Sequence, residues 1–201
     1  MKILDKLIVN RKLFIFLVSI ALFAIVIGSV FACVLAKQDN TEITNETNNF
    51  LTNLSNINYY ESFKNVFFSN IFFLIIIWII AISIIGIPIS LILFFIKSFS
   101  LGFTLASFII TNKLKGLLIN IIYIFPSQII NLFITIYLLS ISLIISFKLL
   151  NSIVKRKSFD FSFIGQYKKV LLFSIILFFI SNLYEIFLTP KILKLVLHFI
   201  N

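Results

Sequence analysis

The chain contains apolar runs that are too long and too free of charge for the core of a soluble domain. Residues 13–36 hold 24 consecutive uncharged side chains, and residues 66–96 hold 31. About 18 to 20 apolar residues are enough for a helix to cross the hydrocarbon core of a bilayer. Of the 201 residues only 12% are charged, against about a quarter in a soluble domain. The sequence therefore predicts an integral membrane protein of the all-α class, a multi-pass bundle of transmembrane helices.

Reactive and metal-binding residue types are sparse, which removes several classes of function. Cys33 and His198 are the only cysteine and histidine, so an intramolecular disulfide and a site built from several such ligands are both excluded. The net charge of +10 comes from Lys and Arg that flank apolar runs, as the positive-inside rule predicts, and we expect no nucleic-acid partner. The sequence shows no glycine-rich phosphate loop and no Ser/His/Asp set. We therefore expect no cofactor, no metal and no enzymatic activity.

Residues 13–36 form the first predicted span. Basic residues precede it at Lys2, Lys6, Arg11 and Lys12, which places the N-terminus in the cytoplasm. The competing interpretation is a lipoprotein cleaved at Cys33, because "VFAC" at 30–33 resembles a cleavage box. The apolar run is longer than the roughly 7 to 15 residues of a signal-peptide core. We therefore expect a retained anchor.

The one long polar segment, residues 37–65, carries four of the seven acidic residues of the chain. Because the first span leads outward, this segment is predicted to be an external loop. Phe50, Leu54 and Ile57 recur in it at helical spacing, which predicts a short amphipathic helix on the outer membrane surface. Two interpretations stay open: a solvated connector, or a surface on which these three side chains contact a partner protein.

The 31 uncharged residues from 66 to 96 are too many for one span, because such a helix would measure about 46 Å against a hydrocarbon core of about 30 Å. Gly86 and Pro88 lie within this apolar region. Proline removes a helix hydrogen bond and disfavours the helical conformation of the residue before it. The sequence therefore predicts a hairpin of two spans, 66–85 and 88–110, joined by a tight cytoplasmic turn. A single kinked helix is the alternative.

Two features of the second arm indicate packing inside the bundle. Ser98, Gly102 and Ala106 are four residues apart, a spacing that lets two membrane helices approach closely, and we expect this face to meet another span. Lys97 is predicted near mid-depth, where lipid exposure would cost about 3 kcal/mol. We therefore expect Lys97 to extend to the membrane surface, to pair with an acid or to line a polar cavity.

Residues 117–147 also exceed the length of one span, and Pro126, Ser127 and Gln128 interrupt them. We interpret them as a re-entrant half-helix, a break at Pro126 and a span over 128–150. A broken helix is stable at membrane depth only where protein or water satisfies the freed backbone groups. The broken helix near Pro126 is therefore expected inside the bundle.

The last 51 residues contain the remaining predicted elements. Residues 151–169 form a basic loop, which the positive-inside rule assigns to the cytoplasm, and residues 170–188 form the fifth span, with Glu185 near its outer end. Residues 190–201 separate polar from apolar side chains, a pattern typical of an interfacial helix. The chain 1–201 is thus predicted to be one membrane domain of about five spans, with its N-terminus inside and its C-terminus outside. A contact between Lys97 and Glu185 follows from their similar predicted depth.

Three motifs carry a resemblance to a known family: "GIPISLILFFIKSFSLGFT" at 86–104, "FPSQ" at 125–128 and "YEIFLTP" at 184–190. With the N-terminal anchor and the acidic outer loop, their order resembles the stage II sporulation protein M family of endospore-forming bacteria, over essentially the whole chain. Ser98 departs from the pattern, because a glycine often follows the lysine in the family. By this resemblance we assign helix packing or assembly to the signature positions Gly86, Pro88, Lys97, Gly102, Pro126, Gln128, Glu185 and Pro190.

The resemblance implies a non-catalytic membrane component of the engulfment machinery. In the family, the protein helps to recruit and hold two peptidoglycan hydrolases, the stage II sporulation proteins D and P, while the mother-cell membrane migrates around the forespore. The expected partners are these hydrolases and membrane lipid, and the expected location is the sporulation septum and the engulfing cell membrane. We expect no small-molecule substrate.

A small permease, or the membrane subunit of a transporter, is the alternative function. A broken helix near Pro126 and a buried lysine at position 97 are also features of transporters. This alternative predicts a water-accessible path that reaches both positions.

Overall fold

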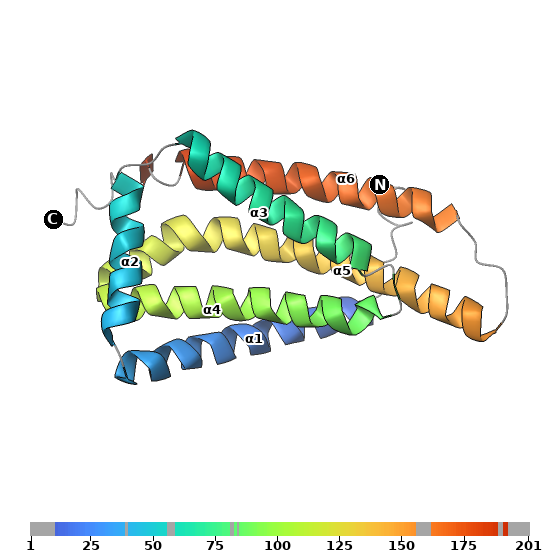
Figure 1. Ribbon diagram of the computed structural model, residues 1–201, viewed down its shortest axis with the longest axis horizontal. Helices are drawn as coiled ribbons and strands as arrows, with labels where there is room; N and C mark the ends of the chain where they lie inside the picture. Colours follow the sequence, from blue (N-terminus) through green and yellow to red (C-terminus); the bar gives the residue numbers. More distant parts are fainter. Residues whose placement is uncertain are drawn as a thin grey trace.

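The computed structural model (Figure 1) describes residues 11–38, 40–55, 59–80, 83, 85–155, 162–188 and 191–192. These residues form helices and short turns, and no strand occurs among them. The α-helices are α1 (Arg11–Gln38), α2 (Asn40–Ser55), α3 (Tyr59–Ile80), α4 (Gly86–Ile119), α5 (Phe125–Val154) and α6 (Ser162–Leu183), and the π-helical stretches are η1 (Asn120–Ile124) and η2 (Tyr184–Leu188). The fold is the all-α bundle that the sequence predicts.

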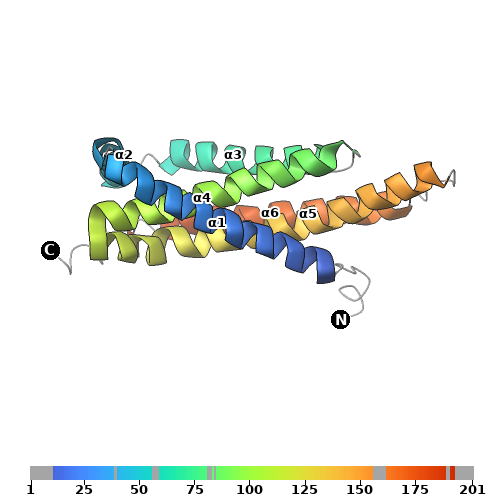
Figure 2. The same cartoon turned by 90° about the horizontal axis from the view of Figure 1, so that it is seen from below.

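The helices α1, α3, α4, α5 and α6 run roughly along one axis (Figure 1, Figure 2). One end of the bundle holds the start of α1, the turn between α3 and α4, the end of α5 and the start of α6. The opposite end holds α2, the start of α3, the reversal between α4 and α5, and the end of α6. The chain therefore crosses the bundle five times. These two ends correspond to the predicted cytoplasmic and external sides, and the sidedness itself stays a prediction.

Four helical segments are long and apolar enough to span a membrane, namely Arg11–Gln38, Gly86–Ile122, Phe125–Val154 and Lys168–Leu188. The remaining predicted span, 66–85, corresponds to α3. The apolar part of α3, Phe67–Ile80, is shorter and measures about 21 Å as a helix. The described part of the chain therefore has the character of a membrane protein, with four full-length candidate spans and one short apolar helix.

Polarity in the bundle is the inverse of that in a water-soluble protein. Large apolar side chains such as Phe23 and Phe72 are exposed on the outside, whereas Ser98 and Asn131 are completely buried. Several buried hydroxyls donate to a carbonyl of their own helix, as Ser98 does to Phe94 at 2.9 Å. Hydrocarbon supplies no hydrogen bonds, so polar groups in membrane proteins turn inward and apolar groups face lipid.

The helices α1 and α4 run in the same direction and pack backbone to backbone. A Cβ atom on Gly28 would overlap the main-chain carbonyl of Phe99, and a Cβ atom on Gly102 would overlap that of Ile25. The Ser29 hydroxyl donates a hydrogen bond to the Gly102 carbonyl at 3.1 Å. Small residues permit this close approach, which strengthens van der Waals packing in lipid. The small-residue face around Gly102 thus meets another span of the same chain, as predicted.

The region around Gly86 and Pro88 forms a turn between two helices and not one kinked helix. α3 ends at Ile80, and α4 begins at Gly86. The Gly86 amide donates to the Ser83 carbonyl at 3.0 Å, and a Cβ atom on Gly86 would overlap the Ile80 carbonyl. Pro88 lies in the first turn of α4, where a backbone N–H has no helical acceptor and its loss is harmless. The two residues therefore position the turn.

The reversal between α4 and α5 lies at Lys113, which has φ 49° and ψ −120° within a helical run. Beyond Lys113 the chain returns beside α4. The side-chain amide of Asn120 there donates a hydrogen bond to the Leu105 carbonyl at 2.7 Å. The break predicted at Pro126 takes the form of η1, and Pro126 itself lies in the first turn of α5, after a helical Phe125. A π-helical turn accommodates the hydrogen bond that proline cannot donate. The helix is distorted there, but it is not interrupted.

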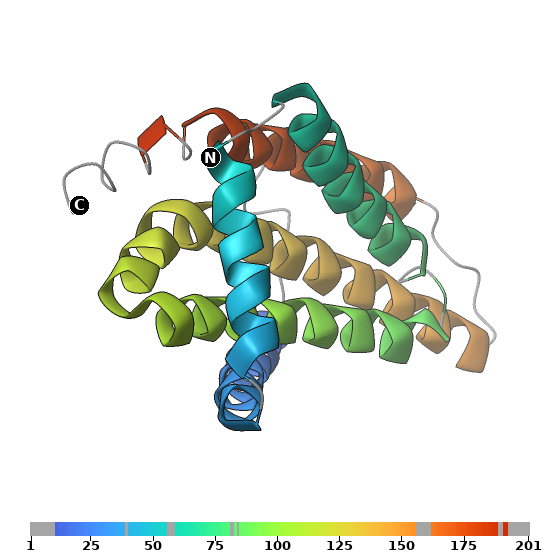
Figure 3. The same cartoon turned by 60° about the vertical axis from the view of Figure 1, so that its left-hand side comes forward.

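The predicted external loop, 37–65, is largely helical. It contains the last two residues of α1, the whole of α2 and the first turns of α3. α2 crosses one end of the bundle, in front of α4 in the view of Figure 3. Its Ile43 and Thr47 are buried. The Asn- and Thr-rich sequence has weak helix propensity, so packing of this inner face against the bundle provides the stability.

The helices at the other end extend further than predicted. α5 continues to Val154 and α6 begins at Ser162, which shortens the predicted basic loop, 151–169. Residues 156–161 of that loop lie outside the described residues. Of the predicted interfacial helix, 190–201, the structure describes only residues 191–192, which are helical.

Candidate functional site

A cavity of about 980 Å³ lies between α3 and α4. Figure 1 shows these helices diverging from the turn that joins them, with α2 across the wide end and α5 behind. Apolar atoms supply most of its lining surface, and polar side chains from several helices lie among them. Polar residues within membrane helices usually face the bundle interior or a water-filled cavity. The polar residues that the long helices and η2 contribute include Asn70, Lys97, Ser100, Thr104, Gln128 and Glu185.

α4 presents a polar stripe to this cavity. Lys97, Ser100, Thr104 and Ser107 are three or four residues apart and all line the cavity, so they share one side of the helix. Gly102 faces α1, and α4 therefore has one face for packing and another for the cavity. The Thr104 hydroxyl donates to the Ser100 carbonyl at 2.9 Å, which leaves the Thr104 oxygen able to accept a hydrogen bond from a molecule in the cavity.

Lys97 carries the positive charge of the cavity, about 16 Å along α4 from its start. Its Nζ atom is buried and has no hydrogen-bond partner among the described residues. This atom lies 4.2 Å from the ring centroid of Phe73 and 5.2 Å from that of Phe178, distances that allow cation–π attraction. Lys97 also interacts electrostatically with Glu185. The ammonium is thus held by rings and by a nearby opposite charge, without a direct hydrogen bond.

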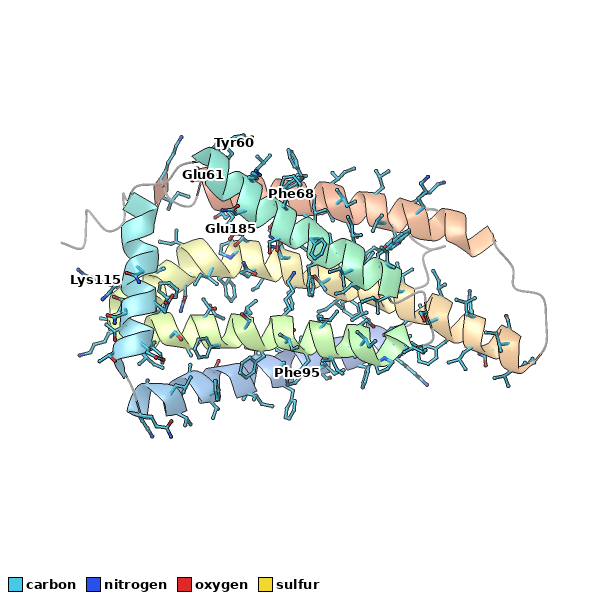
Figure 4. The ribbon with its side chains drawn as sticks, in the orientation of Figure 1. Tyr60, Glu61, Phe68, Phe95, Lys115 and Glu185 are labelled. Carbon is cyan, nitrogen blue, oxygen red and sulfur yellow. The ribbon has the colours of Figure 1, made fainter. Side chains whose placement is uncertain are left out.

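Glu185 lies on η2 and is only 7% exposed. In Figure 4 it lies inside the bundle, whereas Phe68 on α3 points outward. Its carboxylate accepts a hydrogen bond from the side chain of Ser127, and Ser181 donates to the Ser127 carbonyl at 3.2 Å. These bonds tie Glu185 to the first turn of α5 and keep its charge in the same cavity as Lys97. The sequence predicted a contact between Lys97 and Glu185. The two side chains line one cavity and interact electrostatically, but the Lys97 Nζ atom makes no hydrogen bond to Glu185.

The α3 wall of the cavity is held in place by an amide pair. The Asn70 Nδ2 atom donates to the Asn182 Oδ1 atom at 2.9 Å, and Asn182 is completely buried on α6. Asn70 also lines the cavity. Our sequence analysis missed both residues. The sequence did contain a sign of this pair, because Asn70 and Asn182 are strongly polar amides within apolar runs. Such residues in membrane helices usually form hydrogen bonds between helices.

The end of the cavity at α2 is acidic. Glu42 and Glu46 of α2 line it and are exposed, and residues four apart lie on the same side of a helix. With Glu185 and Lys97, the lining carries three carboxylates and one ammonium. An acidic rim of this kind attracts cations and repels anions that approach from water.

The structure brings part of the predicted signature set together. Lys97, Gln128 and Glu185, which are far apart in sequence, line the same cavity. The other described members of the set lie in turns and helix contacts and do not line it: Gly86, Pro88, Gly102 and Pro126. The signature positions thus divide into cavity residues and residues that shape the backbone.

The remaining predicted positions cannot be compared in this way. Pro190 and Ile57 lie outside the described residues, as do the side chains of Phe50 and Leu54. The contact with a partner protein proposed for Phe50, Leu54 and Ile57 therefore stays a prediction.

Both π-helical stretches border the cavity, since Ile124 of η1 and Glu185 of η2 line it. π-helical turns occur frequently at functional sites, where they change the direction of a side chain. Among the described residues, no group of three or more His, Cys, Asp or Glu side chains could hold a metal ion.

The fold and the cavity define an all-helical, multi-pass membrane protein with a charged interior site. The family model described as "Stage II sporulation protein M" matches residues 13–190, and the chain belongs to this family. The resemblance drawn from the sequence motifs is thereby confirmed. Comparisons with curated proteins and with solved structures found no match.

Proposed function

We propose that this chain is a non-catalytic membrane scaffold for septum migration and forespore engulfment during sporulation. In this role it recruits or stabilises peptidoglycan hydrolases, the stage II sporulation proteins D and P, at the septal membrane. The observation that carries the proposal is the family match over residues 13–190. The close packing of Gly28 against the Phe99 main chain and of Gly102 against the Ile25 main chain supports it, because a bundle with such tight helix contacts suits a protein that holds others in place.

We propose the outer face of α2 as the surface that contacts these extracytoplasmic partners. On this helix Ile43 and Thr47 are buried, and the bundle holds the opposite face towards the outside. The described residues of that face that do not line the cavity are exposed and polar: Thr41, Asn45, Asn48 and Asn49. Such a face can form the hydrogen bonds of a protein–protein interface.

The contact is tested by co-purifying the hydrolases with variants of the full chain from sporulating cells. Exchange of residues 37–65 for an inert linker of equal length should release them. Asn45→Ala combined with Asn48→Ala should reduce recovery at least five-fold, as expected when interface residues that bind strongly are truncated. Asn151→Ala, the same change at an exposed position at the other end of the bundle, is the control. Equal recovery with all variants would contradict a contact through α2.

The cavity favours the permease as the second candidate function. It reaches Lys97 and Gln128, close to the distorted helix at Pro126, as a transport path would require. Intramembrane charges that line a cavity are typical of substrate and ion pathways. Transport requires in addition that the path continue towards the opposite side of the membrane, and the cysteine-labelling experiment in the Discussion distinguishes the two functions on that point.

A further inference from the structure

The cavity contains two opposite charges that do not touch. Lys97 and Glu185 both line it and attract each other electrostatically. The Lys97 Nζ atom is nevertheless without a hydrogen-bond partner among the described residues. A buried ammonium whose hydrogen bonds are unmade is costly, and more so at membrane depth. The Lys97 ammonium can therefore still donate a hydrogen bond to a molecule that binds in the cavity that this residue lines.

The charges of the lining restrict what that molecule can be. A purely anionic ligand would meet Lys97 but would be repelled by Glu185 and by Glu42 and Glu46 at the α2 end. A purely cationic ligand would meet Glu185 but would be repelled by Lys97. Such repulsion selects among ligands as effectively as attraction does. A zwitterion satisfies both interior charges at once.

The size and polarity of the cavity fit a small amphipathic ligand. Its volume of about 980 Å³ lies within the range of roughly 300 to 1,000 Å³ that is usual for ligand sites. Phe73, Leu101 and Phe108 contribute apolar surface, while Thr104 and Gln128 offer hydrogen bonds. The ligand therefore needs an apolar body next to its charged groups.

The cavity is accessible from two directions. Glu42 and Glu46 are exposed at the α2 end, where a water-soluble molecule would enter. Ile96 also lines the cavity and is exposed on α4, within a predicted membrane span, where a lipid would enter from the bilayer.

We propose that this cavity binds a zwitterion, with an anionic oxygen group of the ligand on the Lys97 ammonium and an ammonium group of the ligand near the Glu185 carboxylate. This chemistry has two sources: a free amino acid with an apolar side chain, or the phosphoethanolamine head group of a phospholipid. The site does not depend on the scaffold role, since a bundle can bind a ligand without transporting or converting it.

Binding is measured on the full chain in nanodiscs of phosphatidylglycerol. In one arm, leucine is titrated and compared with isoamylamine and 4-methylpentanoate, each of which keeps only one of its charged groups. In the other arm, phosphatidylethanolamine is compared with its N-acetylated form, which lacks the ammonium, by native mass spectrometry. We expect the zwitterion of at least one arm to bind at least ten-fold more tightly than its single-charge analogues. Failure of both zwitterions to bind, or equal binding of the analogues, would overturn the proposal.

Variants show whether the binding occurs in this cavity. Lys97→Gln and Glu185→Gln should each weaken it at least ten-fold, whereas Lys115→Gln, a change of an exposed lysine at the α4–α5 reversal, should leave it unchanged. If the charge variants do not fold, Thr104→Leu decides, because it fills the cavity and leaves both charges in place. Undiminished binding in folded Lys97→Gln, or in Thr104→Leu, would overturn the assignment.

Discussion

Gly28 of α1 and Gly102 of α4 each lie against the main chain of the other helix, so the crossing has no room for a side chain at either position. We predict that Gly102→Leu lowers the free energy of unfolding by about 1 to 3 kcal/mol or more, because overpacking forces the two backbones apart. Thermal unfolding in detergent micelles measures this change. Val26→Leu, on the exposed side of α1, is the control and should shift the free energy by less than about 0.5 kcal/mol. Equal stability of the two variants would contradict the close contact.

The charges at Lys97 and Glu185 should be energetically coupled. Lys97→Met leaves Glu185 without its nearby cation, and Glu185→Gln leaves Lys97 without its nearby anion, so each single variant is expected to be destabilised. In the double variant neither charge remains, and its loss of stability should be smaller than the sum of the single losses by about 0.5 to 3 kcal/mol. Exchange of the two residues, Lys97→Glu with Glu185→Lys, should restore part of the stability that either single exchange removes. Strict additivity of the single losses would show that the two groups do not interact.

Water should reach the cavity near Ser100 but not the first turns of α4 near Ser90. In a Cys33→Ser background, we predict that Ser100→Cys reacts with a membrane-impermeant thiol reagent, because Ser100 lines the cavity and is exposed. Ser90→Cys should stay unlabelled, because Ser90 is completely buried about 15 Å further along the helix. Labelling at both positions would reveal a path through the bundle and favour the permease.

The two ends of the bundle should lie on opposite sides of the membrane. By the positive-inside rule, we predict that Asn45→Cys on α2 is labelled in intact cells, and that Asn151→Cys at the end of α5 is labelled only after permeabilisation. Both positions are exposed, so accessibility does not bias the comparison. The reverse pattern would place α2 in the cytoplasm and remove it as a surface for extracytoplasmic hydrolases.

Features that depend on local chemistry were predictable from the sequence. Gly86 and Pro88 act on the backbone around them, and the turn lies where they predict it. The four-residue spacing of Ser98, Gly102 and Ala106 depends only on helix geometry, and it correctly indicated a close helix contact. The apolar runs likewise predicted a membrane bundle, because their length is set by the thickness of the bilayer.

Features that depend on tertiary packing were not predictable in the same way. The reversal at Lys113 contains no proline. Its glycine, Gly116, packs against the Phe108 main chain, and the Asn120 side chain bonds to Leu105, contacts that only the folded chain reveals. The pairing of Asn70 with Asn182 joins residues 112 positions apart, which no local pattern reveals. The cavity arises because α3 and α4 diverge beneath α2. Of its lining, the sequence pointed only to Lys97 and Glu185, as charges within membrane spans, and to Gln128, through the family resemblance.

The scaffold role is tested most directly by locating the stage II sporulation proteins D and P in sporulating cells that lack this chain. If the chain holds these hydrolases at the septum, fluorescent fusions to them should disperse over the cell membrane, and the engulfing membrane should stop migrating. Re-expression of the intact chain should restore both. Hydrolases that stay concentrated at the septum, with engulfment running to completion, would contradict the proposed function.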